Sequence, residues 1–358
     1  MIGRHIAYFE RKLELLEGDV PPPPPGAVVA RVTMAGVCGT DAHRLAGEVK
    51  GPDEPISLGH ESVGVLVELG EGVTADFAGS PISVGDRIAW LPGGGCHRCH
   101  ACVTLQNENI CENIRWPVVS TLPNGAGYRD YATLLDGDIF YRVDDDTPDE
   151  AVVALGCALP TALGLMERLG RIAPGQSIVV QGSGPVGLSA TLLAAQSSAS
   201  KVILIGTGED RLAWGTTFGA THIIDIETTT PEQRLAEVLE LTEGLGADIV
   251  LEGTGFIDAF TEGIAMLGKH GRYVIAGLYA GDKTVPFNPV LLNNRNLEII
   301  GSYFGRASHR REALAIVAKL HKDVNLSAMV THRFPLDKTE EAINLMASGH
   351  AVKVVVVP

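Results

Sequence analysis

Short runs of apolar residues, many of them β-branched and most bounded by glycine or a polar residue, recur along this chain of 358 residues. In the first 150 residues, which are rich in glycine and proline, the runs 27–37 and 62–70 have this character and predict strands. Extended helical periodicity is scarce in the same region. The first part of the chain is therefore predicted to be a β-rich domain.

From about residue 158 onward, short apolar runs alternate with helix-like stretches such as 185–196 and 231–244. Strands that alternate with helices are typical of βαβ units and of a parallel sheet buried on both faces. The sequence thus predicts an α/β protein in which 158–301 forms a doubly wound parallel-sheet domain. The tail 302–358 is expected to return to the first domain, which then comprises 1–157 and 302–358. The predicted strands of the parallel sheet are 177–182, 201–206, 221–226, 247–253, 271–277 and 297–304.

The charge balance narrows the range of partners. The formal net charge is −15 and the pI is about 5.1, which argues against nonspecific binding to nucleic acid or to anionic membranes. The N-terminal residues 1–18 lack the continuous apolar core of a signal peptide. The longest uncharged run, 151–166, is too short to span a membrane. We therefore expect a cytoplasmic protein, whose thiols stay reduced.

A glycine-rich turn follows the first predicted strand of the parallel sheet. Gly182, Gly184 and Gly187 fit the pattern G-x-G-x-x-G, with Pro185 and Val186 between the last two glycines. The glycines permit a tight turn and a close approach of pyrophosphate to the backbone, and the helix N-terminus favours the phosphate charge. Since this turn lies between a predicted strand and a predicted helix, it predicts dinucleotide binding.

The second predicted strand of this sheet ends at Gly206, where an acidic residue normally binds the adenine ribose of NAD. Glu209 and Asp210 follow in the next loop and are candidates to replace that acid. Arg211 is a candidate for the 2′-phosphate of NADP, but its acidic neighbours would oppose a dianion. NAD is therefore the favoured cofactor, and NADP stays open.

Four of the six cysteines lie within sixteen residues, in a segment predicted to form a lobe at about 92–115. Four closely spaced thiolates are typical of a closed, tetrahedral structural zinc site. An iron–sulfur cluster is an alternative, whereas disulfides do not suit a reducing compartment and a nucleic-acid-binding zinc ribbon would require basic flanks. His97 and His100 are expected to face solvent. The predicted ligands are Cys96, Cys99, Cys102 and Cys111.

The other two cysteines lie in motifs that occur together in a known family. Cys38 lies in GVCGTDAH, His60 and Glu61 in GHESVG, and Cys157 in GCALPTAL. With GYRDYATL, the four-cysteine segment and GSGPVG, these motifs resemble those of zinc-dependent medium-chain alcohol dehydrogenases, in the same order and over nearly the whole chain. The resemblance implies a GroES-like catalytic domain, a Rossmann cofactor domain, and reversible hydride transfer between an alcohol and NAD(P).

The resemblance also implies roles for individual residues. Cys38, His60 and Cys157 would bind a catalytic zinc, giving two zinc ions per chain, and Glu61 would lie close to that metal. Thr40 and His43 match a proton relay, although Thr40 is also a candidate cap for a helix beginning at Asp41, and His43 for an exposed helix residue. Thr161 matches a contact to the nicotinamide.

Two other functions are compatible with parts of the sequence. A zinc-free quinone or enone reductase shares the expected fold but lacks the three catalytic ligands. A non-catalytic nucleotide-binding protein would keep only the structural zinc. The family resemblance further implies a small-molecule alcohol or carbonyl substrate and a homodimer or homotetramer. Trp116, Leu122 and Tyr279 are candidate pocket residues.

Overall fold

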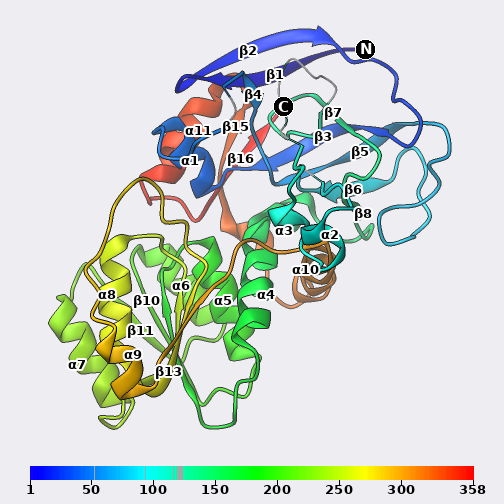
Figure 1. The fold of residues 1–358 in the computed structure, drawn as a ribbon. Coiled ribbons are helices and arrows are strands. Elements are labelled where there is room, and N and C mark those ends of the chain that lie inside the picture. The colour runs from blue at the N-terminus through cyan, green and yellow to red at the C-terminus, as the bar shows by residue number, and fades with distance from the viewer. Residues whose placement is uncertain (52, 93, 116, 118, 120–123) are drawn as a thin grey trace. The chain divides into compact units, whose positions relative to one another are not determined.

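The computed structural model describes residues 1–358 except 52, 93, 116, 118 and 120–123. The predicted pocket residues Trp116 and Leu122 thus lie outside the described residues. The chain divides into two compact units. The first comprises Met1–Cys157 together with Arg306–Pro358, and the second comprises Ala158–Gly305 (Figure 1).

The first unit is built on a mostly antiparallel sheet with strand order β15-β16-β3-β5-β6-β8, in which β7 also pairs with β3. A smaller sheet has the order β2-β1-β4. Valine, isoleucine and leucine side chains of the large sheet form a core with residues of α11. The strands are β1 (Ile2–Phe9), β2 (Lys12–Asp19), β3 (Val28–Gly36), β4 (Ile56–Ser57), β5 (Ser62–Leu69), β6 (Arg87–Trp90), β7 (Tyr131–Leu134), β8 (Phe140–Arg142), β15 (Val330–Pro335) and β16 (Lys353–Val357).

The end of the chain returns to this unit beside its beginning. Strand β16 pairs antiparallel with β3, so that Val355 lies opposite Gly36, and the two strands lie side by side in red and blue (Figure 1). This pairing brings residues more than 300 positions apart into one sheet. The α-helices of the unit are α1 (Gly39–Leu45), α2 (His100–Val103), α3 (Asp149–Leu155), α10 (Ala307–Leu320) and α11 (Thr339–Ala347).

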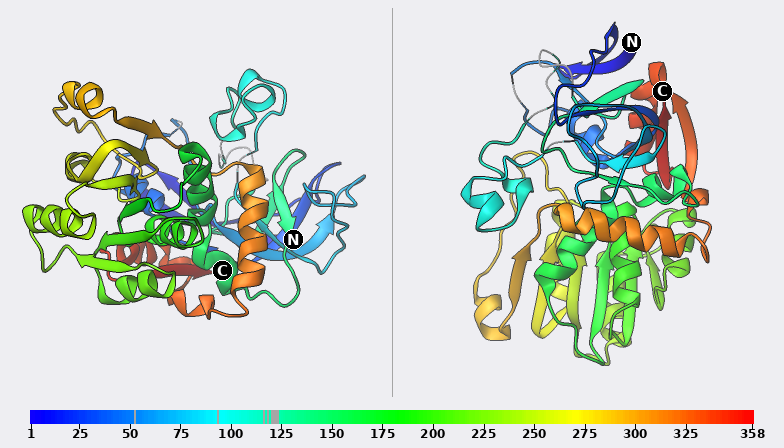
Figure 2. Two further views of the ribbon diagram at one scale, coloured as in Figure 1. Left: turned by 90° about the horizontal axis from the view of Figure 1, so that it is seen from below. Right: turned by 90° about the vertical axis from the view of Figure 1, so that its right-hand side faces the viewer.

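The second unit is a parallel sheet with strand order β11-β10-β9-β12-β13-β14, the order of a doubly wound Rossmann fold. Helices cover both faces of this sheet (Figure 2), which explains why its central strands are continuous runs of buried apolar residues. Its strands are β9 (Ser177–Gln181), β10 (Lys201–Gly206), β11 (His222–Asp225), β12 (Ala247–Glu252), β13 (Leu267–Ile275) and β14 (Glu298–Gly301). Its helices are α4 (Ala158–Leu169), α5 (Pro185–Ala195), α6 (Glu209–Thr217), α7 (Pro231–Leu241), α8 (Ile257–Met266) and α9 (Val290–Arg295).

The predicted α/β class, with a β-rich domain and a doubly wound domain, is confirmed. The N-terminal hairpin of β1 and β2 was not predicted, because β2 is half exposed and carries charged residues at its exposed positions. Pro160 lies in the first turn of α4, where the missing N–H has no helical partner to lose. No single helix among the described residues is long and apolar enough to cross a membrane, and only α3 and α4 taken together as a broken pair meet that criterion.

Candidate metal centres and cofactor turn

Four side chains from three separate segments of the first unit place possible metal ligands close together. Donor atoms of Cys38, His60, Glu61 and Cys157 all lie within 4.8 Å of one another. The two sulfurs are 3.5 Å apart, close to the separation of about 3.8 Å that tetrahedral zinc with Zn–S bonds of about 2.3 Å requires. Nε2 of His60 is buried without a hydrogen-bond partner in the described part of the chain. The two thiols and the imidazole therefore fit a zinc ion.

Each of these ligands is placed by the start or end of an element. Cys38 follows β3 and is the N-cap of α1, His60 and Glu61 precede β5, and Cys157 follows α3. Side chains at such ends can project into a shared space while the backbone groups of the elements stay paired. Three loops thus place the possible metal-ligand atoms close together.

Asp41 connects the first ligand segment to the histidine. Its side chain is buried, and Oδ2 accepts hydrogen bonds from the backbone N–H of Cys38 (3.1 Å) and from the hydroxyl of Tyr128 (2.8 Å). Oδ1 lies 3.6 Å from Nδ1 of His60. A carboxylate beside one ring nitrogen orients the other nitrogen toward a metal. The helix begins at Gly39 and not at Asp41, and sequence reasoning missed both Tyr128 and the approach of Asp41 to His60.

Glu61 forms an ion pair with Lys353 of β16, in which both side chains are 1% exposed. Sequence reasoning missed Lys353, because nothing local marks it as a site residue. Two glycines make room for the carboxylate. A Cβ at Gly36 would lie 2.2 Å from Oε2 of Glu61, and a Cβ at Gly156 would lie 2.4 Å from the same atom. The space beside the ligands is therefore shaped for a buried carboxylate.

The ionisation of the donor groups is mutually dependent. A hydrogen bond from Cys157 and the charge of His60 outweigh burial and lower the pKa of Cys38 well below its usual range. Hydrogen bonding to Cys38 and burial raise the pKa of Cys157. Burial lowers the pKa of His60, but Asp41 and Cys38 outweigh it and raise the pKa overall. The group therefore already stabilises a thiolate, the form in which cysteine binds a metal.

The predicted relay residues lie in α1, immediately after the first ligand. Oγ1 of Thr40 lies 3.8 Å from Sγ of Cys38. Nδ1 of His43 lies 2.6 Å from Oε2 of Glu48, and the His43 side chain is 34% exposed. Thr40 and His43 share no hydrogen bond among the described residues. Thr40 is thus placed beside the metal ligands, and His43 reaches solvent.

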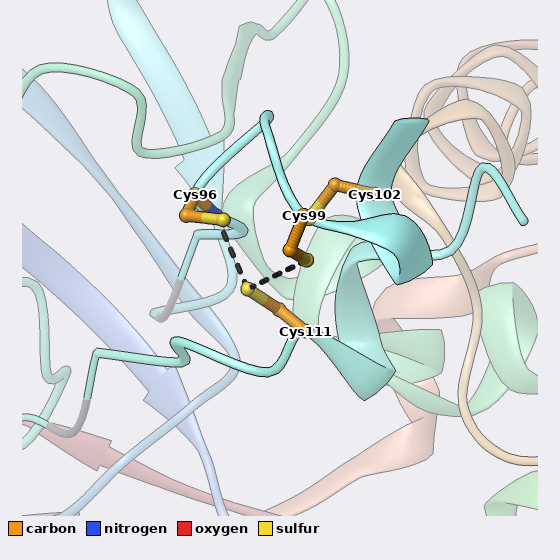
Figure 3. Close-up of side chains that lie close together, drawn as sticks. All are labelled: Cys96, Cys99, Cys102 and Cys111. Atoms are coloured by element: carbon orange, nitrogen blue, oxygen red, sulfur yellow. Dashed lines mark hydrogen bonds between the residues drawn. The ribbon is translucent and has the colours of Figure 1, made fainter. Parts of the chain in front are cut away.

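The second cysteine group converges as a separate site, in which donor atoms of all four thiols lie within 4.8 Å of one another (Figure 3). Sγ of Cys99 lies 3.8 Å from Sγ of Cys111, the separation expected of tetrahedral zinc ligands. Backbone N–H groups of Cys96 and Asn113 donate to the Cys111 sulfur, each at 3.3 Å. Such donors stabilise thiolates around a metal. His97 and His100 are exposed, as predicted.

The lobe that carries these cysteines is attached to α10. The side chain of Glu108 accepts a hydrogen bond from the backbone N–H of Ala307. Nη1 of Arg306 donates to the carbonyl of Gln106 at 3.2 Å, and Nη2 of Arg310 donates to the side-chain oxygen of Asn109 at 3.1 Å. Organisation of the lobe is therefore linked to the C-terminal part of the first unit.

In the second unit, the glycine turn connects β9 to α5. Gly182 has a φ of 107°, in the left-handed region that favours glycine. A Cβ at Gly187 would lie 1.7 Å from the carbonyl oxygen of Gly182, so only glycine fits there. Gly184 is the N-cap of α5, and Pro185 and Val186 begin the helix. The turn has the geometry that leaves the helix N-terminus open to phosphate.

Steric crowding explains why β10 ends in a glycine. A Cβ at Gly206 would lie 2.4 Å from Cβ of Ser183, so an acidic side chain cannot occupy this position while Ser183 stays in place. Ser183 Oγ accepts from the N–H of Thr207 (2.9 Å) and donates to its carbonyl (2.6 Å). The hydroxyl of Thr207 in turn donates to Glu227, which follows β11. A carboxylate therefore does reach the end of β10, from a residue that sequence reasoning missed.

The remaining predicted cofactor residues also lie in the second unit. Glu209 and Asp210 are exposed in the first turn of α6. Burial lowers the pKa of the neighbouring Arg211. Thr161 is buried in α4, and Tyr279 follows β13 with its hydroxyl buried.

Known proteins share both units. The sequence pattern of the alcohol dehydrogenase GroES-like domain matches residues 24–144, and that of the zinc-binding dehydrogenase matches residues 185–319. The 5-exo-hydroxycamphor dehydrogenase of Pseudomonas putida is 40% identical over 351 residues, covering 98% of this chain and 97% of that protein. Alcohol dehydrogenase 6 of Peromyscus maniculatus is 30% identical, covering 97% and 94%.

Two solved structures are similar to this chain over its full length. An alcohol dehydrogenase from Thermotoga maritima superposes with a TM-score of 0.90 at 28% identity, covering 100% of both chains. A zinc-binding dehydrogenase from Sinorhizobium meliloti bound to NADP has a TM-score of 0.85 at 25% identity, also covering both chains completely.

The GroES-like unit, the Rossmann unit and the relatives together define an NAD(P)-dependent oxidoreductase that acts on alcohols. The chain belongs to the zinc-dependent medium-chain alcohol dehydrogenase family.

Proposed function

We propose that Cys38, His60 and Cys157 bind the catalytic zinc of this dehydrogenase, and that the four-cysteine lobe binds a second, structural zinc. This assignment is supported most strongly by the convergence of the two sulfurs with Nε2 of His60, which has no hydrogen-bond partner among the described residues. Zinc in such a site lowers the pKa of a hydroxyl and polarises a carbonyl as a Lewis acid. Three protein ligands would leave the zinc accessible to one further ligand, as in other catalytic sites of this kind.

Neighbouring residues hold the ligands and move the proton. Asp41 orients His60 through Nδ1, while Lys353 balances the charge of Glu61. Thr40 would accept the proton of the alcohol hydroxyl while its own hydroxyl proton passes on to the cofactor ribose. His43 would receive a proton from that ribose and release it to solvent at its exposed edge, assisted by Glu48. Positioned proton transfer of this kind typically contributes about 10²–10⁴-fold to the rate.

NAD is the proposed cofactor. Glu227, held by Thr207 at the end of β10, supplies the carboxylate that Gly206 lacks, and Glu209 and Asp210 add negative charge nearby. This charge opposes the 2′-phosphate of NADP, the cofactor bound to the Sinorhizobium relative. The dissociation constants of both cofactors, measured by NADH and NADPH fluorescence, test the preference. Glu227→Gln should reduce the preference for NAD, and a wild-type preference for NADP would contradict the proposal.

For the substrate we propose an apolar cyclic secondary alcohol, by analogy with the hydroxycamphor dehydrogenase that is 40% identical. The test is NADH formation from primary, secondary, cyclic and polyol alcohols at matched concentrations. The highest kcat/KM should belong to a cyclic secondary alcohol. A clear preference for primary alcohols or polyols would contradict this assignment without affecting the zinc sites.

The central experiment replaces one catalytic ligand. Cys157→Ala should lower the zinc content from two ions per chain to one, abolish alcohol-dependent NADH formation, and leave NADH binding by the second unit unchanged. Turnover near the wild-type value would show that Cys157 is not a ligand. One zinc per wild-type chain would favour the zinc-free reductase or the non-catalytic binding protein. Two zinc ions without any alcohol-dependent signal would favour the binding protein.

We also propose that the protein is a cytoplasmic homo-oligomer. Free cysteines and two sites that require reduced thiols support a reducing compartment. Dimers or tetramers follow from the family resemblance. Light scattering coupled to gel filtration distinguishes these states, and a monomeric mass at micromolar concentration would contradict the proposal.

A further inference from the structure

A fully buried carboxylate lies at the end of a central strand of the second unit. Glu252 is the last residue of β12 and is 0% exposed. Its Oε1 accepts hydrogen bonds from the backbone N–H groups of Thr254 (2.5 Å) and Gly255 (2.8 Å), and from the hydroxyl of Thr254 (2.5 Å). Burial of a carboxylate is costly unless hydrogen bonds compensate it. Here those bonds fix the residues 253–255, which we call the β12 turn.

The hydrogen bonds of Glu252 continue into the next helix. The hydroxyl of Thr254 accepts from the backbone N–H of Phe256 at 2.9 Å, and Phe256 is the N-cap of α8. The other carboxylate oxygen, Oε2, has no hydrogen-bond partner among the described residues. A Cβ at Gly277, just after β13, would lie 2.4 Å from this oxygen. The segment after β13 therefore leaves room for the carboxylate because it carries glycine at this position.

The β12 turn packs against the glycine turn that follows β9. A Cβ at Gly182 would lie 2.9 Å from Cγ2 of Thr254, and a Cβ at Gly253 would lie 3.2 Å from the backbone nitrogen of Gly187. The N–H of Gly253 donates to the carbonyl of Gln181, the last residue of β9, at 2.9 Å. Because contacts this close leave no slack, a displacement of the β12 turn displaces the glycine turn as well.

The strand order places both turns where a dinucleotide is expected to bind. Strands β9 and β12 are neighbours, and the sheet continues through β10 and β11 on one side and through β13 and β14 on the other. In doubly wound sheets, ligands bind outside the carboxyl ends of the strands at such a reversal of strand order. The glycine turn and the β12 turn follow the carboxyl ends of these two strands. A residue that fixes the β12 turn therefore also orders the site that binds the cofactor.

We propose that Glu252 is a positioning residue for the dinucleotide. It acts through its hydrogen bonds to Thr254 and Gly255, which hold the β12 turn against the glycine turn before the cofactor binds. A turn that is already ordered reduces the entropic cost of binding. The proposal rests on dinucleotide binding at the glycine turn. It does not depend on the choice between NAD and NADP or on the zinc sites.

The test is the dissociation constant of NADH, measured by fluorescence with the full-length zinc-loaded protein. Glu252→Met removes the acceptor and should raise this constant about 10-fold, with the KM for NAD rising similarly and kcat at saturating NAD unchanged. Glu252→Gln should bind NADH as the wild type does, because its amide oxygen accepts the same hydrogen bonds. If Glu252 acted through its charge, Glu252→Gln would bind the anionic cofactor more tightly than the wild type, and that result would overturn the proposal.

The matched control is Asp248→Leu, at the other end of the same strand. Asp248 also accepts hydrogen bonds from the backbone N–H and the hydroxyl of one residue, Ser177, at 2.8 and 2.9 Å. This variant should lower the melting temperature and leave the dissociation constant of NADH unchanged. Equal increases of that constant in Asp248→Leu and Glu252→Met would show a general structural effect and would overturn the proposal.

A milder variant provides a test that does not require Glu252→Met to fold. Thr254→Val keeps a methyl group against Gly182 but loses the hydroxyl that donates to Glu252, so the dissociation constant of NADH should rise by a smaller factor. A wild-type constant in Thr254→Val or in Glu252→Met would overturn the role of Glu252 alone. Failure of the wild-type protein to bind NADH or NADPH would overturn the cofactor assignment together with it.

Discussion

Lys353 of β16 and Glu61, the residue that follows the proposed ligand His60, form an ion pair from which solvent is almost entirely excluded. They are 292 positions apart, and the pairing of β16 with β3 brings them together. Burial raises the pKa of Glu61, whereas the positive charge of Lys353 lowers it. The effect of burial is larger, so the pKa is raised overall. Burial lowers the pKa of Lys353. The interactions with Glu61 and with the thiols Cys38 and Cys157 outweigh this effect and raise the pKa overall. The lysine is therefore a fixed positive charge beside the ligands.

Lys353→Met should destabilise the protein by about 3–5 kcal/mol, because it leaves a buried carboxylate without its counter-ion. Guanidinium chloride unfolding measures the change. The double variant Lys353→Met/Glu61→Gln should recover part of the loss, since it removes the uncompensated charge. Lys338→Met is the control, because its pair with Glu341 is exposed, and it should change stability far less than Lys353→Met does. Equal effects of the two lysine variants would contradict the importance of burial.

Asp41→Asn should weaken zinc binding at the catalytic site about 10–100-fold, because the amide orients His60 less strongly than the carboxylate. Competition with a chromogenic chelator measures the dissociation constant of the zinc ion that is bound less tightly. The control is Asp130→Asn, which loses only the half-exposed pair with Arg4. Unchanged affinity in Asp41→Asn would show that the backbone of Cys38 and Tyr128 are its only functional partners.

Cys99→Ser should mainly affect stability. Loss of one thiolate opens the closed site, and we expect a clear fall in melting temperature, because loss of a metal is among the changes that destabilise proteins most. Zinc content should fall to one ion per chain, while NADH binding stays unchanged because the lobe belongs to the first unit. A variant with normal melting temperature and two zinc ions would exclude a structural role for this cysteine.

His43→Ala should lower kcat near neutral pH by about 10²-fold if the proton leaves through this residue. Added imidazole should restore part of the activity, because His43 is partly exposed. His332→Ala is the matched control, since His332 is also exposed and its ring bonds, within the described part of the chain, only to the neighbouring Thr331. Its kcat should equal that of the wild type. Full activity of His43→Ala across pH 6–8 would remove His43 from the relay.

Features encoded within short segments were predictable from the sequence. The alternation of apolar runs and helical stretches identified the strands of the parallel sheet. The signal was clearest for β9, β10 and β12, because strands buried on both faces consist of nearly continuous apolar residues. The glycine turn was recognisable because two of its glycines are required by the backbone geometry, Gly182 through its positive φ and Gly187 through its close approach to the carbonyl of Gly182. The amphipathic hairpin of β1 and β2 was missed, because its mixture of charge and apolar residues resembles a loop.

The amino-acid sequence by itself determined the order of elements, the glycine-rich turn and the four-cysteine cluster, since each depends on local spacing. The group of Cys38, His60 and Cys157 was implied only by the family resemblance, because its members lie far apart along the chain. The tertiary structure decided which distant side chains meet. It placed Lys353 against Glu61, Asp41 and Tyr128 behind His60, and Glu227 beside the end of β10. The physical reason is that strand pairing and core packing determine these long-range contacts. The sequence around a buried charged residue does not indicate which distant residue will neutralise it.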